Sequence, residues 1–223
     1  MIAIAIIPRG PWERYDDSLR PGICSPELPG RLTSRATRTL MATMTDTPPV
    51  FVDLDPLTFG PDQTCFGCGP SNDRGLRLRF RREGDTVTTR FVLGRGHDGP
   101  PDLLHGGLQA TICDELAGWV LVGLRDRIGV TTSMNVRYIR GIRLGEPCDG
   151  VGRIASDSGG ITTIRIKLLQ DGKLCCTASV SFAMASSARM EELLPRGVPE
   201  GWHRFFDGPG TDPMKPDEPP EKI

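Results

Sequence analysis

A single long helical pattern among strand-like segments is the feature that most limits the fold. Residues 105–124 repeat apolar side chains with the period of an α-helix. Six segments have strand patterns, two before the helix and four after it: 75–80, 86–93, 130–140, 148–156, 161–170 and 173–184. One helix cannot cover both faces of a doubly wound parallel sheet, but it can lie on one face of a curved antiparallel sheet. The sequence therefore predicts an α+β fold.

The ends of the chain differ in composition from its middle. Residues 1–48 are rich in Pro, Arg, Ser and Thr without a period, so we predict disorder there, and two methionines near position 44 also allow a later start codon. Residues 50–185 are long enough for one core. Residues 186–223 are predicted to be a mostly disordered tail, because their last third is rich in Pro and charge.

Composition excludes several functional classes. The net charge of −1 gives no basic field for nucleic acid. No apolar run approaches the roughly 20 residues that cross a bilayer. The seven cysteines are scattered and odd in number, which does not suggest a disulfide framework. We therefore expect a cytoplasmic protein without a nucleic-acid or membrane partner.

The predicted helix begins with His105, Gly106 and Gly107. The first N–H groups of a helix have no intrahelical acceptor, and the helix dipole adds positive character there. Glycine has no Cβ, so a carbonyl oxygen can approach these donors closely. The stretch is either a simple turn before the helix or an oxyanion site made of backbone N–H groups.

Asp114 lies on the helix side opposite the apolar stripe, among small residues. It follows His105 by nine residues, which corresponds to about 13 Å of rise and opposite directions. The two side chains cannot easily serve one reacting atom within one chain. If both act in catalysis, the site combines His105 to Gly107 of one protomer with Asp114 of another. This predicts a dimer.

Cys65 and Cys68 have the spacing of half a zinc ribbon. A structural zinc site requires four ligands, and the other close pair, 175–176, consists of adjacent residues that are poorly placed to chelate. We therefore expect no metal. Glu115 projects near the edge of the apolar stripe, where it either pairs with a basic strand residue or shows that the stripe is narrower.

Four segments together resemble a known family. The pattern H-G-G-x-x-A-x-x-x-D at 105–114 resembles the hotdog-fold acyl-CoA thioesterases of the phenylacetate-pathway (PaaI-like) superfamily. The resemblance extends to CFGCGPSNDRGLRLRF (65–80), HDGPPDLLHGG (97–107) and MNVRYIRGIRLGEP (134–147). It covers about Cys65 to Met184.

The resemblance implies a curved six-stranded antiparallel sheet wrapped around one long central helix. It implies a homodimer with a continuous sheet, or a homotetramer, acting on acyl-CoA without a cofactor. Asp114 would be the general base or nucleophile, and the N–H of Gly106, with that of Gly107, would polarise the thioester carbonyl. His105 would orient this carbonyl or line the pocket, and Thr131 would help to hold water.

Three arginines follow the predicted strand at 130–140 or lie on it, and they are candidates for contact with the CoA phosphates: Arg137, Arg140 and Arg143. One departure from the family is Gly99, where some members carry an Asn that positions water. A non-catalytic acyl-CoA-binding module of the same fold remains the alternative function. A hotdog dehydratase is less well matched by the spacing of His105 and Asp114.

Overall fold

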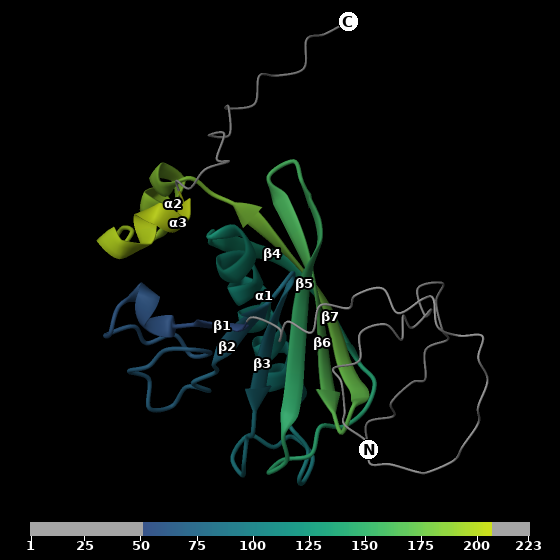
Figure 1. The fold of residues 1–223 in the computed structure, drawn as a ribbon. Helices are drawn as coiled ribbons and strands as arrows, with labels where there is room; N and C mark the ends of the chain where they lie inside the picture. The colour runs from purple at the N-terminus through teal and green to yellow at the C-terminus, as the bar shows by residue number, and fades with distance from the viewer. Residues whose placement is uncertain (1–50, 207–223) are drawn as a thin grey trace, which may run out of the picture. The chain divides into compact units, whose positions relative to one another are not determined.

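The computed structural model describes residues 51–206, where seven strands form one antiparallel sheet (Figure 1). The order across the sheet is β1-β2-β3-β5-β6-β7-β4. The bounds are β1 Phe51–Leu54, β2 Phe80–Glu83, β3 Thr86–Phe91, β4 Gly129–Tyr138, β5 Cys148–Ser158, β6 Ile161–Gln170 and β7 Lys173–Met184. The segment expected to be disordered, 1–48, lies outside the described residues.

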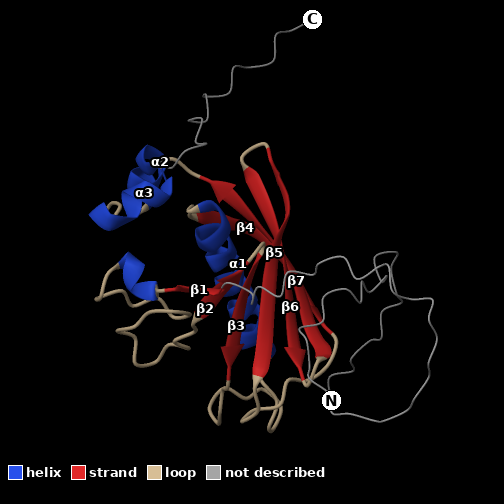
Figure 2. Cartoon of the chain, viewed as in Figure 1, coloured by secondary structure: helices blue, strands red, loops and turns tan. Residues whose placement is uncertain are grey.

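Helix α1, Gly106–Arg125, packs against the sheet (Figure 2). Ile112, Leu116 and Val120 are fully buried, as are Cys113 and Leu121 on other sides of the helix. The buried face is therefore wider than the single stripe that the sequence suggests, because α1 contacts strands from β2 to β7. The expected α+β arrangement of one long helix on an antiparallel sheet is confirmed.

Two glycines of β5 bring the helix close to the sheet. A Cβ on Gly150 would lie 3.0 Å from a methyl carbon of Leu116, and one on Gly152 would lie 2.6 Å from a methyl carbon of Val120. Both distances are shorter than ordinary carbon contacts, which are about 3.5–4.0 Å. The absence of side chains at these positions thus sets how closely α1 approaches the sheet.

We expect Gly152→Ala to lower the free energy of unfolding by about 1–3 kcal/mol, the usual cost of overpacking a core. The new methyl group would lie 2.7 Å from Ile166 as well as against Val120, so neither neighbour can move away freely. Urea unfolding of wild type and variant measures the effect. Gly94→Ala is the control, because nothing lies within 4 Å of a Cβ at Gly94. Equal stability of Gly152→Ala and wild type would contradict this account of the packing.

The strand predicted at 75–80 does not form, although its side chains alternate between buried and exposed as predicted. Leu76, Leu78 and Phe80 are buried while Arg77 and Arg79 are exposed, as the alternation indicates. However, Arg77 has a φ of 51°, in the left-handed region that an extended strand cannot contain. The strand β2 therefore begins only at Phe80.

The sheet has one strand more than the six expected, because β1 adds to its edge by pairing with β2. β1 is only four residues long, and its burial pattern is mostly exposed. Such a short, mostly exposed edge strand has little of the period-two hydrophobic signal by which strands are recognised.

The start of the segment predicted to be mostly disordered, 186–223, contains short helices. Residues 187–206 form α2 (Ser187–Leu193), a 3-10 turn and α3 (His203–Phe206). Phe205 and Phe206 are fully buried, and Trp202 and Phe205 lie against the ring of Phe59 with centroids 5.2 and 5.0 Å away. Aromatic burial therefore orders this segment, whose period is too short to predict from sequence. Residues 207–223 lie outside the described part.

Candidate active site

His105 caps the N-terminus of α1. Its Nδ1 accepts a hydrogen bond of 2.9 Å from the N–H of Gly107, which satisfies one of the free donors of the first turn. Its ring lies against Gly99, where a Cβ would be 3.2 Å from the His105 Cδ2. The Gly107 amide is therefore engaged by the cap, and Gly99 leaves room for the histidine at the place of the family's Asn.

The N–H of Gly106 is an open donor of this turn: among residues 51–206 it has no hydrogen-bond acceptor. The carbonyl of Gly106 accepts a hydrogen bond of 2.9 Å from the Tyr138 hydroxyl. Tyr138 lies at the end of β4, so the first residue of the helix is anchored through its carbonyl to the edge of the sheet. A fixed N–H of this kind can stabilise negative charge on a carbonyl oxygen.

Asp114 is half-buried on α1, and its Oδ1 accepts a hydrogen bond of 3.0 Å from the Thr131 hydroxyl. Thr131 is on β4, where the register with β7 shifts between Thr131 and Ser133. Such a bulge changes the direction of neighbouring side chains. The structure thus brings together two predicted site residues, Asp114 and Thr131, within one chain.

β4 is the last strand in the order of the sheet and is exposed over most of its length. Large apolar side chains lie on it and just after it: Val130, Met134, Tyr138 and Ile139, with 38–53% of their surface exposed. An exposed edge strand with apolar side chains is typically a surface that pairs with another chain.

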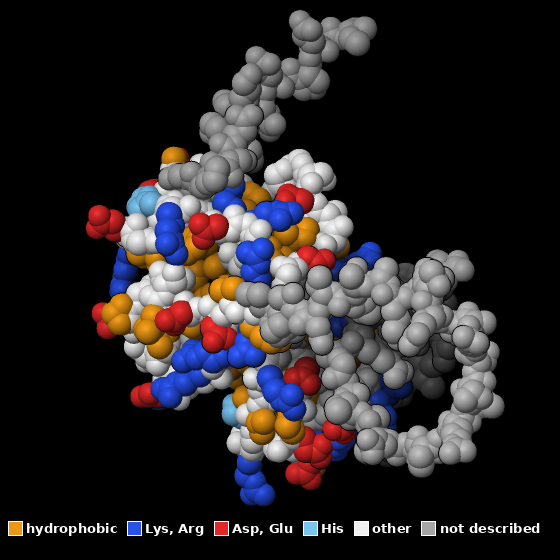
Figure 3. All heavy atoms as spheres, viewed as in Figure 1, with side chains coloured by type: hydrophobic (Ala, Val, Ile, Leu, Met, Phe, Trp, Pro, Cys, Tyr) orange, Lys and Arg blue, Asp and Glu red, His pale blue; other side chains and the backbone are white. Residues whose placement is uncertain are grey.

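The three candidate arginines differ in their surroundings. Arg140 is exposed, and one of its N–H groups donates to the carbonyl of Leu174 at 2.7 Å. Arg137 is half-buried on β4. Arg143 forms ion pairs with Glu146 and Asp171, so its charge is already neutralised by two carboxylates. The described face in Figure 3 shows Lys and Arg beside Asp and Glu, not basic side chains alone.

The comparison with family models matches residues 102–177 to the thioesterase superfamily. This stretch contains the helix start, Asp114 and Thr131. The fold is accordingly the hotdog fold that the sequence predicted, with seven strands in place of six.

Solved structures similar to the chain include a thioesterase superfamily protein at 27% identity, covering 52% of this chain and 57% of that protein with a TM-score of 0.49. Another is a phenylacetic acid degradation-related protein from Ralstonia eutropha JMP134 (18% identity, 48% and 85% covered, TM-score 0.45). A third is a hypothetical thioesterase protein with coenzyme A from Streptococcus pneumoniae TIGR4 (19% identity, 44% and 80% covered, TM-score 0.42). No curated protein matches.

Residues 51–206 also contain a cluster that sequence analysis missed. Glu115 does not pair with a basic strand residue: its carboxylate accepts hydrogen bonds from Trp119 Nε1 at 3.2 Å and from the Cys65 thiol at 3.4 Å. Burial raises the pKa of Glu115 to about 7. Cys65 and Glu115 are 50 residues apart, so spacing alone could not join them. The available signal was the position of Glu115 beside the apolar stripe.

Among residues 51–206, no helix is both long and apolar enough to span a membrane.

Proposed function

We propose that this protein hydrolyses acyl-CoA to the free acid and CoA, at a site shared between two copies of the chain. The main observation in support is that α1 presents both a backbone N–H donor, at Gly106, and a carboxylate held in place, at Asp114. The N–H of Gly106 is open and the carbonyl of the same residue is held by Tyr138, while the Asp114 carboxylate is held by Thr131. A carbonyl-binding donor and a fixed carboxylate are together sufficient for thioester hydrolysis.

The arrangement of β4 supports a site made by two protomers. Thr131, which holds Asp114, lies near one end of β4, and Tyr138, which holds Gly106, lies at the other end. If two copies of β4 pair antiparallel about a twofold axis near Met134 and Asn135, Thr131 of one protomer lies opposite the partner's Tyr138. Each Asp114 would then come near the Gly106 amide of the other chain.

Two hollows of the single chain lie away from the proposed site. One, of about 570 Å³, lies between β1 and the end of α1, and another, of about 480 Å³, lies beside the loop around Gly99. Neither is lined by Gly106 or Asp114. A second chain over β4 would supply the missing wall of the site.

In the proposed reaction the Gly106 N–H donates to the thioester oxygen and makes the carbonyl carbon more electrophilic. Asp114 either takes a proton from the attacking water or attacks the carbonyl itself. The C–S bond then breaks, and CoA leaves as a thiolate, which takes up a proton. Attack by water gives the free acid directly, whereas attack by Asp114 gives an acyl anhydride that a water molecule then hydrolyses to the free acid and the Asp114 carboxylate. Thr131 orients the carboxylate, and His105 fixes the turn that presents the donor.

For the CoA phosphates we propose Arg140 and Arg137 of the exposed β4 region. We leave Arg143 out of this role because a phosphate would have to replace Glu146 and Asp171. On the cysteine pattern, we keep the cytoplasm as the proposed location.

The test is release of CoA from a panel of acyl-CoAs of different chain length and aromatic character, measured by the free thiol. We expect at least one substrate to be cleaved with kcat/KM of about 10⁴ M⁻¹s⁻¹ or more. A CoA thioether of the same acyl chain is the control, which binds but cannot release CoA. Binding of thioethers without cleavage of any thioester would instead support the non-catalytic acyl-CoA-binding module.

A further inference from the structure

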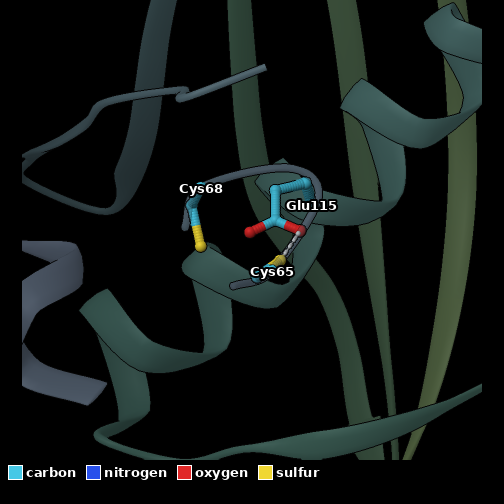
Figure 4. A group of neighbouring side chains, drawn as sticks. All are labelled: Cys65, Cys68 and Glu115. Atoms are coloured by element: carbon cyan, nitrogen blue, oxygen red, sulfur yellow. Dashed lines mark hydrogen bonds between the residues drawn. The ribbon is translucent and has the colours of Figure 1, made fainter. Parts of the chain in front are cut away.

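Cys65, Cys68 and Glu115 form a compact group outside the proposed active site. One sulfur or oxygen atom from each side chain lies within 4.8 Å of the other two. Figure 4 shows the two thiols, from the loop before β2, pointing toward the carboxylate of Glu115 on α1. Cys68 is buried with 3% of its surface exposed, whereas Cys65 and Glu115 are half-buried.

The loop is shaped to hold these atoms together. The N–H of Gly69 donates to the carbonyl of Cys65 at 2.9 Å, and a Cβ on Gly69 would lie 2.5 Å from that oxygen. A Cβ on Gly67 would lie 2.4 Å from the Glu115 carboxyl group. Glycine is therefore required at position 69 to close the turn between the cysteines, and at position 67 it leaves room for the carboxylate in this orientation.

The carboxylate of Glu115 is oriented by hydrogen bonds, but among residues 51–206 no positively charged side chain pairs with it. Trp119 donates to one carboxylate oxygen, and the other faces the sulfur of Cys65. Within the described part of the chain, no Lys, Arg or His forms an ion pair with Glu115. A partly buried carboxylate beside two thiols has its charge compensated poorly unless a cation binds there.

We propose that Cys65, Cys68 and Glu115 bind one Zn²⁺ ion, with water as the fourth ligand. Two sulfur ligands favour zinc over the hard cations Mg²⁺ and Ca²⁺, which bind through oxygen. Zinc accepts sulfur and carboxylate ligands in a tetrahedron. On binding, the metal replaces the two thiol protons, which are released to solvent. The ion ties the loop of residues 65–69 to α1, independently of the proposed hydrolysis.

This site revises the expectation of no metal. That expectation counted only cysteines and histidines near in sequence, whereas the third ligand is a glutamate on the central helix. Trp119 then acts as an orienting group for a ligand, as outer hydrogen bonds commonly do at metal sites.

The test is the zinc content of the full chain, reduced, loaded with ZnCl₂ and freed of excess metal. Elemental analysis should give about one zinc per chain for wild type and for Cys148→Ala, which changes a buried thiol elsewhere. Cys65→Ala, Cys68→Ala and Glu115→Gln should each lose most of the metal. Circular dichroism shows whether each variant is folded.

A second measurement tests the site on the wild type, so it does not depend on whether the variants fold. Wild type loaded with Co²⁺ in place of zinc should show sulfur-to-cobalt charge-transfer absorption. A chelator should lower its melting temperature by several degrees. Wild type that binds no zinc when reduced, or that binds cobalt without sulfur absorption, would overturn the site. Equal zinc content in folded Cys65→Ala would do the same.

Discussion

Asp114→Asn is expected to lower kcat for acyl-CoA hydrolysis about 10³-fold, with a much smaller effect on KM. The amide has nearly the shape of the carboxylate, and its oxygen can still accept the hydrogen bond from Thr131. It can neither take a proton from water nor attack a thioester. The loss therefore reports the chemistry of the carboxylate and not the packing of α1. Steady-state release of CoA from the best substrate of the panel measures it.

The matched control is Asp85→Asn, at an exposed turn between β2 and β3. It makes the same change of charge and should keep full activity. Equal activity of Asp114→Asn and wild type on every cleaved thioester would remove Asp114 from the mechanism. The protein would still be a thioester hydrolase in that case, but a group other than Asp114 would have to act as the base.

Mixing two inactive variants is expected to restore about a quarter of wild-type activity. One variant is Asp114→Asn and the other is Gly106→Pro. In a mixed dimer, one site combines the normal Gly106 of the first chain with the normal Asp114 of the second, and the other site has both defects. Equal mixing gives half mixed dimers, each with one working site of two. Activity is followed after co-refolding or subunit exchange.

Gly106→Pro removes one N–H at a position where proline is tolerated. Gly106 is the first helical residue, and His105 before it has φ −56° and ψ 133°, which suits a residue preceding proline. Loss of one oxyanion donor is expected to lower kcat about 10²–10³-fold. Gly106→Ala is the control, because it keeps the N–H and its Cβ would lie 3.6 Å from Tyr138, an ordinary contact.

The outcome of the mixture separates two models of the site. If Gly106 and Asp114 of one chain serve the same substrate, every chain in the mixture carries a defect at its own site. Activity would then stay at the level of the single variants, and the shared site would be wrong. Sedimentation of the wild type shows in parallel whether the chain is a dimer or a tetramer.

The sequence predicted the long helix and most of the sheet because their patterns extend over many residues. It failed where the pattern was short or the backbone was unusual. Residues 75–80 alternate correctly in burial, but the left-handed conformation of Arg77 prevents a strand. β1 is too short to show a period, and the helices after Met184 are ordered by aromatic contacts with Phe59.

Most candidate residues of the site came from a motif that is local in the sequence. The His-Gly-Gly start of α1 and Asp114 lie within ten residues, so the helix period alone placed them on it. The family resemblance named Thr131 only as a residue that helps to hold water, and its hydrogen bond with Asp114 was not predicted, since it joins α1 to an edge strand 17 residues away. Tyr138 and Glu115 were not predicted as partners of Gly106 and Cys65, because neither pair is linked by a repeating pattern.

The aromatic contacts of Phe59 have a consequence for biosynthesis. Trp202 donates a hydrogen bond to the carbonyl of Phe59, 143 residues earlier in the chain, and Arg204 donates to Thr58. The ribosome makes the first partner long before the second. Contacts of such large sequence separation form slowly, since a long loop must close first. The side of Phe59 that Trp202 covers therefore stays open during translation until residues 202–205 have been made.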